Sequence, residues 1–231
     1  MTARVAVVGT GRMGRAVASA ARAKGYDVTA ELGPGELARE RLAGAQVVLE
    51  FTVPDAAAAN LVALAGWGIP TVSGTTGWLE RLPEVRAAVE RAGAALVHSP
   101  NFAVGVHLFV RLARAAGALL APRPEFDAYL LEVHHRDKRD APSGTARLLR
   151  ETLRQADGSR DYAVTSIRAG DVTGTHEIRF EGAGEGIALR HEARDRTVFA
   201  HGALLAAAWL LERPRTGVFS FEDVLFGGEP R

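Results

Sequence analysis

Short apolar runs alternate with segments of helical period through the first hundred residues. Candidate strands occupy residues 4–8, 26–32, 46–51, 69–74 and 94–99. Between the first two runs, Met13, Ala16, Val17 and Ala20 fall on one helical stripe, and Gly25 stands where a helix would end. Strands that alternate with helices typically pair in parallel. The pattern therefore predicts an α/β domain with a Rossmann-like parallel sheet.

The pattern changes after residue 102. Residues 104–120 predict a long apolar helix and residues 129–133 a strand, and residues 175–181 and 187–193 alternate with period two around the glycine-rich turn 182–186. His176, Ile178 and Phe180 share one face of this hairpin. Residues 203–211 predict another helix, and residues 219–225 a short final element. We expect a dinucleotide-binding domain at 1–102 and 197–231, and an α+β substrate-binding and oligomerisation domain with a mixed, largely antiparallel sheet at 103–196.

The bulk composition narrows the class of partner. The 231 residues include 28 Lys plus Arg and 27 Asp plus Glu, a formal net charge of +1, so no excess of charge favours nucleic acid or an anionic membrane. The absence of cysteine excludes disulfides and thiolate metal sites and is typical of a reducing compartment. No apolar run approaches the roughly 20 residues of a membrane span. We expect a cytoplasmic protein with a small-molecule partner.

A GxGxxG motif follows the first predicted strand and opens the first predicted helix. Its residues are the candidate cofactor contacts Gly9, Thr10, Gly11, Arg12, Met13 and Gly14. Such a turn lets the backbone approach a pyrophosphate at a helix N-terminus, although packing alone could also require glycines. Glu31 ends the second strand, where an acid binds the adenine ribose, which favours NADH. Arg12 could instead hold a 2′-phosphate, so NADPH stays open, and Glu31 could simply solvate the strand end.

Two further loops follow strands on the predicted sheet. The first contains Gly74, Thr75 and Thr76, and the second contains Ser99, Pro100, Asn101 and Phe102. Ligands of open parallel sheets bind at the carboxyl ends of the strands, so we expect both loops, with Phe51, to border a nicotinamide or substrate crevice. A turn that needs glycine dihedrals would explain the first loop equally well, and Phe51 could be a core residue.

The segment EVHHRDKRDAPSGTA, residues 132–146, concentrates proton carriers and anion-binding groups. Histidine is the side chain whose unperturbed pKa lies nearest neutral pH, so His134 or His135 is the natural proton donor, and Lys138 adds an ammonium group. We place Pro142 in the first turn of a helix whose apolar stripe is Ala146, Leu149 and Leu153, so that Ser143, Gly144 and Thr145 offer amides and hydroxyls to an anion at its N-terminus.

Other interpretations compete at single positions of this segment. Asp140 is most economically a helix cap. Arg136, Asp137 and Arg139 are typical of a solvated charge cluster. Adjacent histidines could be zinc ligands, but the segment lacks metal-binding spacing, and we predict no metal.

Taken together, these motifs resemble the 4-hydroxy-tetrahydrodipicolinate (dihydrodipicolinate) reductase family of the diaminopimelate route to lysine. The shared motifs are GRMG, EFT, GTTG, NFxxGV, E-x-HHRxKxDAPSGTA, RAGDVTGTH and VFAHGA, nearly end to end in the chain. Two features depart from the family. Its members often have GxxGRMG where this chain has GTGRMG, and many have Arg where this chain has Leu32.

The resemblance implies a reduction, with NADH or NADPH, of a cyclic unsaturated dicarboxylic imine to tetrahydrodipicolinate. It further implies a homotetramer formed through the sheet of the second domain. By the same resemblance His134 is the acid-base residue and Lys138 a second proton donor and carboxylate partner. His135, Gly144 and Thr145 contact substrate, and Ser143 and Thr76 join them. An NADH-sensing regulatory protein and another amino-acid dehydrogenase, acting on aspartate or homoserine, remain the alternatives.

Overall fold

The computed structural model describes residues 2–42, 44–158 and 160–227. Its contacts divide the chain into two compact units. Unit 1 comprises Met1–Ala103 and Arg196–Arg231, and unit 2 comprises Val104–Asp195. Unit 2 is thus inserted between two parts of unit 1 in the sequence.

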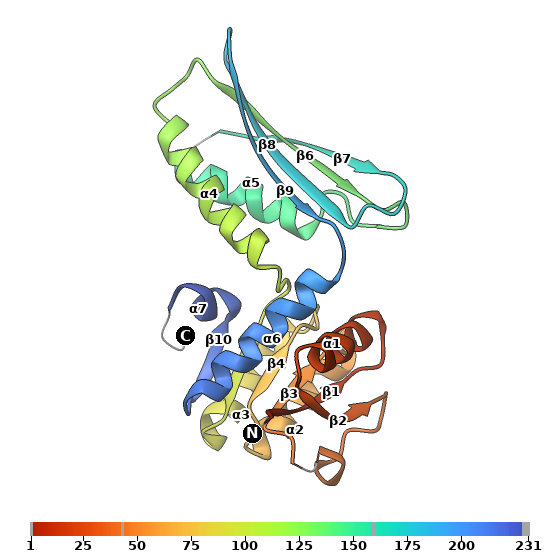
Figure 1. Ribbon diagram of the computed structural model, residues 1–231. Coiled ribbons are helices and arrows are strands. Elements are labelled where there is room, and N and C mark those ends of the chain that lie inside the picture. The colour runs from red at the N-terminus through yellow and green to blue at the C-terminus, as the bar shows by residue number, and fades with distance from the viewer. Residues whose placement is uncertain (1, 43, 159, 228–231) are drawn as a thin grey trace. The chain divides into compact units, whose positions relative to one another are not determined.

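Unit 1 contains a six-stranded sheet in the order β10-β5-β4-β3-β1-β2 (Figure 1). Its strands are β1 (Arg4–Val8), β2 (Asp27–Leu32), β3 (Val47–Glu50), β4 (Thr71–Ser73), β5 (Ala95–His98) and β10 (Gly217–Ser220). Every neighbouring pair is parallel. All four residues of β3 are buried, as expected of a central strand covered on both faces. The predicted Rossmann-like sheet is confirmed.

Helices cover the sheet of unit 1. They are α1 (Arg12–Ala23), α2 (Pro54–Gly66), α3 (Leu82–Ala92), α6 (Thr197–Glu212) and the short α7 (Phe221–Phe226), with 3-10 turns at Arg39–Leu42 and Leu79–Arg81. α1 packs beside α6, and α2 packs beside α3 (Figure 1). Trp78, Leu96 and Val218 join the core under α2 and α3.

The C-terminal segment differs from the sequence prediction in two ways. α6 begins at Thr197, six positions before the predicted start. The prediction missed its first turn because the β-branched residues Thr197 and Val198 are weak helix formers. Residues 219–225 do not form one element. Phe219 lies in β10, which ends at Ser220, and Ser220 caps α7 through a capping box with Asp223, so the chain changes from strand to helix at Ser220.

Unit 2 contains a four-stranded sheet with helices on one face. The strands are β6 (Asp127–His134), β7 (Ala163–Arg168), β8 (Gly174–Glu181) and β9 (Gly186–Ala193), in the order β7-β6-β8-β9. β6 pairs parallel with β7 and antiparallel with β8, and β8 pairs antiparallel with β9. The expected mixed, largely antiparallel sheet is confirmed, and β7, which was not predicted, is its parallel edge.

The helices of unit 2 are α4 (Val104–Leu120) and α5 (Gly144–Asp157), which lie side by side (Figure 1). The apolar side chains of β6 and β8 that face these helices form the core with Phe109, Leu149 and Leu153. The opposite face of the sheet holds Tyr129 and Ile167, which are 40% and 42% exposed. No described helix is long and apolar enough to cross a bilayer.

Candidate functional site

The turn between β1 and α1 requires two of its glycines for packing. Gly9 has φ +115°, and a Cβ there would lie 2.0 Å from the carbonyl oxygen of Phe51. A Cβ on Gly14 would lie 1.7 Å from the carbonyl oxygen of Gly9. The Gly9 amide also donates to the carbonyl of Leu32 at 2.8 Å, which fixes the turn against β2.

Gly11 differs, because a Cβ there would meet nothing within 4 Å. It is the N-cap of α1, with φ −71°, and makes no side-chain cap hydrogen bond. Packing and dihedral angle therefore do not demand glycine at this position. Together with exposed Thr10 and Arg12, it leaves the N-terminus of α1 open, as close approach of a pyrophosphate would need. These residues fit a dinucleotide phosphate.

Glu31 lies near the end of β2 and forms an ion pair with Arg22 from α1. The pair is solvent-accessible, with side-chain exposures of 34% for Glu31 and 55% for Arg22. Many family members have an arginine directly after this acid, where this chain has Leu32, whose side chain is buried. The arginine comes instead from the neighbouring helix, so an acid and a cation meet at the strand end.

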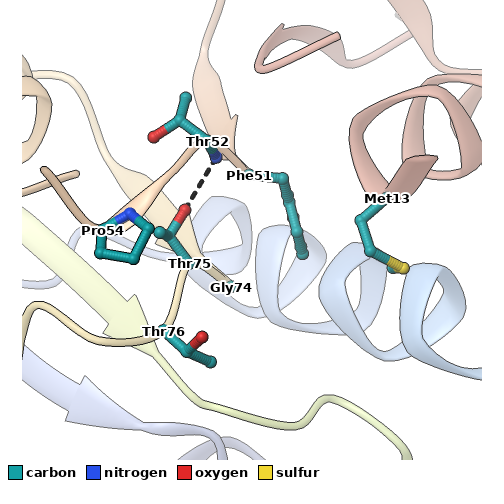
Figure 2. Close-up of a pocket in the computed structure, with 7 residues that line it drawn as sticks. All are labelled: Met13, Phe51, Thr52, Pro54, Gly74, Thr75 and Thr76. Carbon is teal, nitrogen blue, oxygen red and sulfur yellow. Dashed lines mark hydrogen bonds between the residues drawn. The ribbon is translucent and has the colours of Figure 1, made fainter. Parts of the chain in front are cut away.

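A cavity of about 140 Å³ opens at the carboxyl ends of β3 and β4. Its lining residues are Met13, Phe51, Thr52, Pro54, Gly74, Thr75 and Thr76 (Figure 2). The ring of Phe51 lies against Gly74, where a Cβ would approach it to 2.1 Å. The structure thus gathers Met13, Phe51 and the predicted Gly74–Thr76 loop around one space.

Beneath this cavity lies a fully buried carboxylate, Glu50, which the sequence analysis did not identify. Its oxygens accept hydrogen bonds from the hydroxyls of Thr52, Ser73 (2.6 Å) and Thr75 (3.0 Å). Thr75 in turn accepts the amide of Thr52 at 2.8 Å, the bond drawn in Figure 2. Glu50 therefore holds the two loops that line the cavity in fixed positions.

Residues 99–102 connect β5 to α4 but are not among the residues that line the cavity. Ser99 is buried, and its hydroxyl donates to the carbonyl of Asn101 at 2.6 Å. The Asn101 side chain accepts the amide of Ala103 at 2.8 Å. Phe102 is 2% exposed and packs between the rings of Phe51 and Phe221. In this structure Phe102 is a core residue, and Pro100 lies exposed between its neighbours.

In unit 2, β6 ends at His134, which is 7% exposed. Because alternate residues of a strand share a face, Glu132 lies on the same side of the sheet. Glu132 Oε2 is 3.2 Å from His134 Nδ1 and 3.7 Å from His176 Nε2 of β8. The rings of His134 and His176 meet edge to face, with centroids 5.0 Å apart.

Glu132 is fully buried and accepts three hydrogen bonds on Oε1. The donors are the Ser143 amide (2.9 Å), the Ser166 hydroxyl (2.6 Å) and the Arg168 guanidinium (2.9 Å). Burial alone would raise the pKa of Glu132, but these donors outweigh it and lower the pKa to about 2. The carboxylate is therefore ionised at neutral pH.

Both imidazoles of this cluster are harder to protonate than a free histidine. Burial lowers the pKa of His134, and the charge of Glu132 opposes this shift. Burial, followed by the repulsion from His134, lowers the pKa of His176 to about 4. The His176 Nε2 also lies 3.1 Å from the Ser143 hydroxyl. At neutral pH the two rings are mainly uncharged.

The loop after His134 leads to the N-terminus of α5. Lys138 donates to Asp140 at 2.6 Å, and the side chain of His135 is half-buried. Gly144 and Thr145 begin α5, and Arg136, Asp137 and Arg139 are exposed. Four residues predicted as substrate contacts, at positions 135 and 143–145, thus lie on the same loop and helix end as His134 and Lys138.

Two expectations for this loop were wrong. The cap of α5 is Ser143, whose hydroxyl accepts the Ala146 amide at 3.2 Å, whereas Asp140 pairs with Lys138. Pro142 lies before the helix, which begins at Gly144, because its carbonyl accepts the Arg147 side chain and its neighbour Ser143 is extended.

Glu132, His134 and His176 have donor atoms within 4.8 Å of one another, a spacing that an ion could bridge. The Arg168 guanidinium on Glu132 and the Ser143 hydroxyl on His176 already satisfy much of this donor set. A cation would have to enter beside the fixed charge of Arg168. We therefore interpret the cluster as a hydrogen-bonding network.

The sequence analysis missed the role of Glu132, His176, Arg168 and Glu50. The sequence did carry a signal for Glu132 and His176. Both occupy positions of alternating strands that face the core, where burying a charged or titratable side chain costs free energy unless it has partners. For Arg168 the strand itself was not predicted.

Comparison with known proteins agrees with both units. Residues 3–102 match the family profile described as dihydrodipicolinate reductase, N-terminus, and residues 105–225 match dihydrodipicolinate reductase, C-terminus. A Thiobacillus denitrificans protein named 4-hydroxy-tetrahydrodipicolinate reductase is 36% identical over 269 residues, covering 97% of this chain and 99% of its own. A protein of that name from Archaeoglobus fulgidus is 35% identical over 263 residues, covering 96% and 99%.

The fold has a close counterpart among solved structures. A dipicolinate-bound dihydrodipicolinate reductase from Paenisporosarcina sp. superimposes with a TM-score of 0.79 at 22% identity, covering 95% of this chain and 98% of that one. Both halves of the sequence thus lead to one assignment. This chain belongs to the dihydrodipicolinate reductase family.

Proposed function

We propose that this chain reduces 4-hydroxy-tetrahydrodipicolinate to tetrahydrodipicolinate with a reduced nicotinamide dinucleotide. The observation that carries the proposal is the convergence of His134, Lys138 and the N-terminus of α5, capped by Ser143, at one end of the unit 2 sheet. An acid-base imidazole beside an ammonium and free helix amides suits a small dicarboxylate that must also be protonated. Membership in the family supplies the identity of the ring.

The dinucleotide fits unit 1. The open backbone at Gly11 suits the pyrophosphate, and the cavity lined by Phe51 and the Gly74–Thr76 loop suits the nicotinamide end. A bound NAD(P)H supplies the hydride. We assign the other contacts of the dinucleotide to the loop at Ser99, Pro100, Asn101 and Phe102, through its backbone where the side chains are buried.

The chain supplies the proton. Reduction of the ring consumes one hydride and one proton and releases the 4-hydroxyl group as water, so one acid must donate to the electron pair left on the ring. We assign that proton to His134, which returns to neutral imidazole. Lys138 and the amides at Gly144 and Thr145 bind the carboxylates, with His135, Ser143 and Thr76 as further contacts. A dianionic substrate also favours protonation of His134, whose pKa burial otherwise lowers.

We further propose that NADH is preferred, because a carboxylate at Glu31 repels a 2′-phosphate. The protein is proposed to act as a homotetramer in the cytoplasm. The outward face of the unit 2 sheet, with Tyr129 and Ile167 exposed, supports association through that sheet. Sedimentation equilibrium tests this part: a monomer at micromolar concentration would contradict it.

The decisive experiment mixes the protein with NADH and the cyclic imine made freshly from pyruvate and aspartate semialdehyde. Loss of nicotinamide absorbance that depends on the imine is the expected result, and no loss with either dinucleotide would refute the proposal. The variant His134→Gln should lower kcat by about 100-fold or more, because the amide has no proton to give near neutral pH. Wild-type turnover in that variant would remove His134 from the mechanism.

A further inference from the structure

We propose that Glu132 is the positioning residue of His134: it holds a proton on Nδ1 and thereby turns Nε2, the other ring nitrogen, toward the substrate. The catalytic meaning of this inference rests on the proposed function. The arrangement of the two side chains does not, and it can be tested without substrate.

Two facing buried atoms, one on Glu132 and one on His134, lack hydrogen-bond partners among the described residues. Glu132 Oε2 and His134 Nδ1 are both buried, and neither has a hydrogen-bond partner in the described part of the chain. They lie 3.2 Å apart. Buried polar atoms are nearly always paired in folded proteins. Each is therefore the available partner of the other once the imidazole turns enough to point Nδ1–H at Oε2, and the pairing requires the proton on Nδ1.

Hydrogen bonds from other elements fix the orientation of the Glu132 carboxylate. Its other oxygen, Oε1, is occupied by the Ser143 amide, Ser166 and Arg168. These donors come from the cap of α5 and from β7, so the orientation of Glu132 is set by two elements other than its own strand. Oε2 is left to face the imidazole.

Gly174 and His176 lie against the remaining sides of the His134 ring. A Cβ on Gly174 would lie 3.1 Å from His134 Nε2, so a side chain at that position would press on the nitrogen. The His176 ring packs edge to face against His134 and resists rotation. Glycine at position 174 keeps Nε2 clear, while Glu132 and His176 hold the ring from the other sides.

The charge of Glu132 also makes His134 easier to protonate. The charged and titratable groups that face His134 come from its own strand, the following loop and the two neighbouring strands: Glu132, Lys138, Asp140, Arg168 and His176. Glu132 and Asp140 favour the imidazolium, whereas Lys138 and Arg168 disfavour it. Loss of the Glu132 charge would leave Asp140 alone to oppose the two cations.

The test uses the full chain labelled with ¹⁵N in histidine, without ligands, and follows the ring nitrogens of His134 by NMR from acid to alkaline pH. In the wild-type protein the neutral ring should carry its proton on Nδ1. In Glu132→Gln the amide oxygen can take the Oε1 donors, so its NH₂ faces Nδ1. The neutral ring should then move its proton to Nε2, and its protonation constant should fall about tenfold or more.

Ser166→Ala is the matched control. It removes one hydrogen bond from the same carboxylate, but on Oε1 and without a change of charge, so the tautomer of His134 should stay as in wild type. An equal change in both variants, or no change in Glu132→Gln, would overturn the inference. If Glu132→Gln does not fold, the wild-type spectrum decides, since a neutral ring protonated on Nε2 overturns it alone.

Kinetics separate this inference from the proposed function. If His134 is the acid, kcat falls as pH rises through its pKa in the complex, and Glu132→Gln should move this fall to lower pH, with a smaller change in KM. A tautomer change in a protein without reductase activity would keep the inference about geometry and reject the function. If the enzyme is active but Glu132→Gln changes neither the tautomer nor the pH profile, the proposed function stands and the inference about Glu132 is rejected.

Discussion

Gly14 lies so close to Gly9 that a Cβ on Gly14 would approach the Gly9 carbonyl oxygen to 1.7 Å. The variant Gly14→Ala should therefore displace the turn between β1 and α1. We expect a loss of about 1–3 kcal/mol in the free energy of unfolding, the usual cost of overpacking. All three tryptophans, at positions 67, 78 and 209, belong to unit 1, so their fluorescence during urea unfolding measures this loss.

Gly11→Ala is the control for the Gly14 variant, because a Cβ at Gly11 meets nothing within 4 Å and its φ of −71° suits alanine. Its stability should fall by less than about 1 kcal/mol, the usual difference between glycine and alanine at an N-cap. If the pyrophosphate approaches this position, affinity for NADH should nevertheless fall by about tenfold. Unchanged affinity would move the phosphate site away from Gly11.

A second prediction concerns Thr75, which joins the buried Glu50 to the amide of Thr52. Thr75→Val keeps the volume but removes both hydrogen bonds, so the buried Glu50 carboxylate and the part-buried Thr52 amide each lose this partner. We expect a cost of about 1–3 kcal/mol in the free energy of unfolding of unit 1, again from tryptophan fluorescence. Thr76→Val, at an exposed position of the same loop, should cost far less. Equal costs would contradict the role given to Glu50.

A third prediction is a pH dependence of stability from His176. Its pKa in the folded protein is about 4, below the value of about 6.5 for an unfolded histidine. Between these values the unfolded chain binds a proton that the folded chain does not, so the free energy of unfolding falls as pH decreases from about 6.5 to about 4. The free energy of unfolding falls through His176 by at most roughly 3 kcal/mol over this range.

The variant His176→Gln should flatten the stability curve of unit 2 in that range, measured by circular dichroism during urea unfolding. Below it both proteins should lose stability through Glu132, whose lowered pKa of about 2 makes its contribution disappear as pH falls from about 4.5 toward 2. An unchanged slope between pH 6.5 and 4 would mean that His176 is protonated in the folded state.

A fourth prediction concerns the choice of dinucleotide. Glu31→Ala removes the acid proposed to bind the ribose and releases Arg22 from its ion pair. The ratio of KM for NADH to KM for NADPH should rise by about tenfold or more, since Arg22 then becomes available to a 2′-phosphate. Asp27→Ala, at the other end of β2, should leave the ratio unchanged. An unaltered ratio in both variants would remove Glu31 from the ribose site.

The first five strands of unit 1 were predictable because each is a short apolar run bounded by helix or turn residues, whereas β10 was merged with α7 into one predicted element. The β8–β9 hairpin was predictable because Ile178 and Phe180 alternate with polar neighbours, and β6 and α4 were predictable because they contain apolar runs. β7 was not, because Val164 and Ile167 fall on opposite faces of an edge strand and give no clear period. The α5 cap was misplaced because Asp140 and Ser143 are both good capping residues, and only the pairing of Asp140 with Lys138 decides between them.

The candidate site was predictable where its chemistry is local in sequence, as at Gly9–Gly14 and at residues 134–145. Its supporting residues were not, because their partners are distant: Ser166 and Arg168 reach Glu132 only after β7 pairs with β6, and Glu50 meets Ser73 only after β3 pairs with β4. The ion pair of Glu31 with Arg22 likewise depends on how α1 packs on β2.

The last strand among the described residues, β10, pairs with β5, and the whole of unit 2 lies between them in sequence. On the ribosome, the sheet of unit 1 must wait with the edge of β5 unpaired while unit 2 is synthesised, since its sixth strand emerges last. Unit 2 is continuous in sequence and has no such delay. A nascent chain halted before Gly217 would contain the whole of unit 2 and an incomplete sheet in unit 1, which is the stage at which we expect chaperone contact.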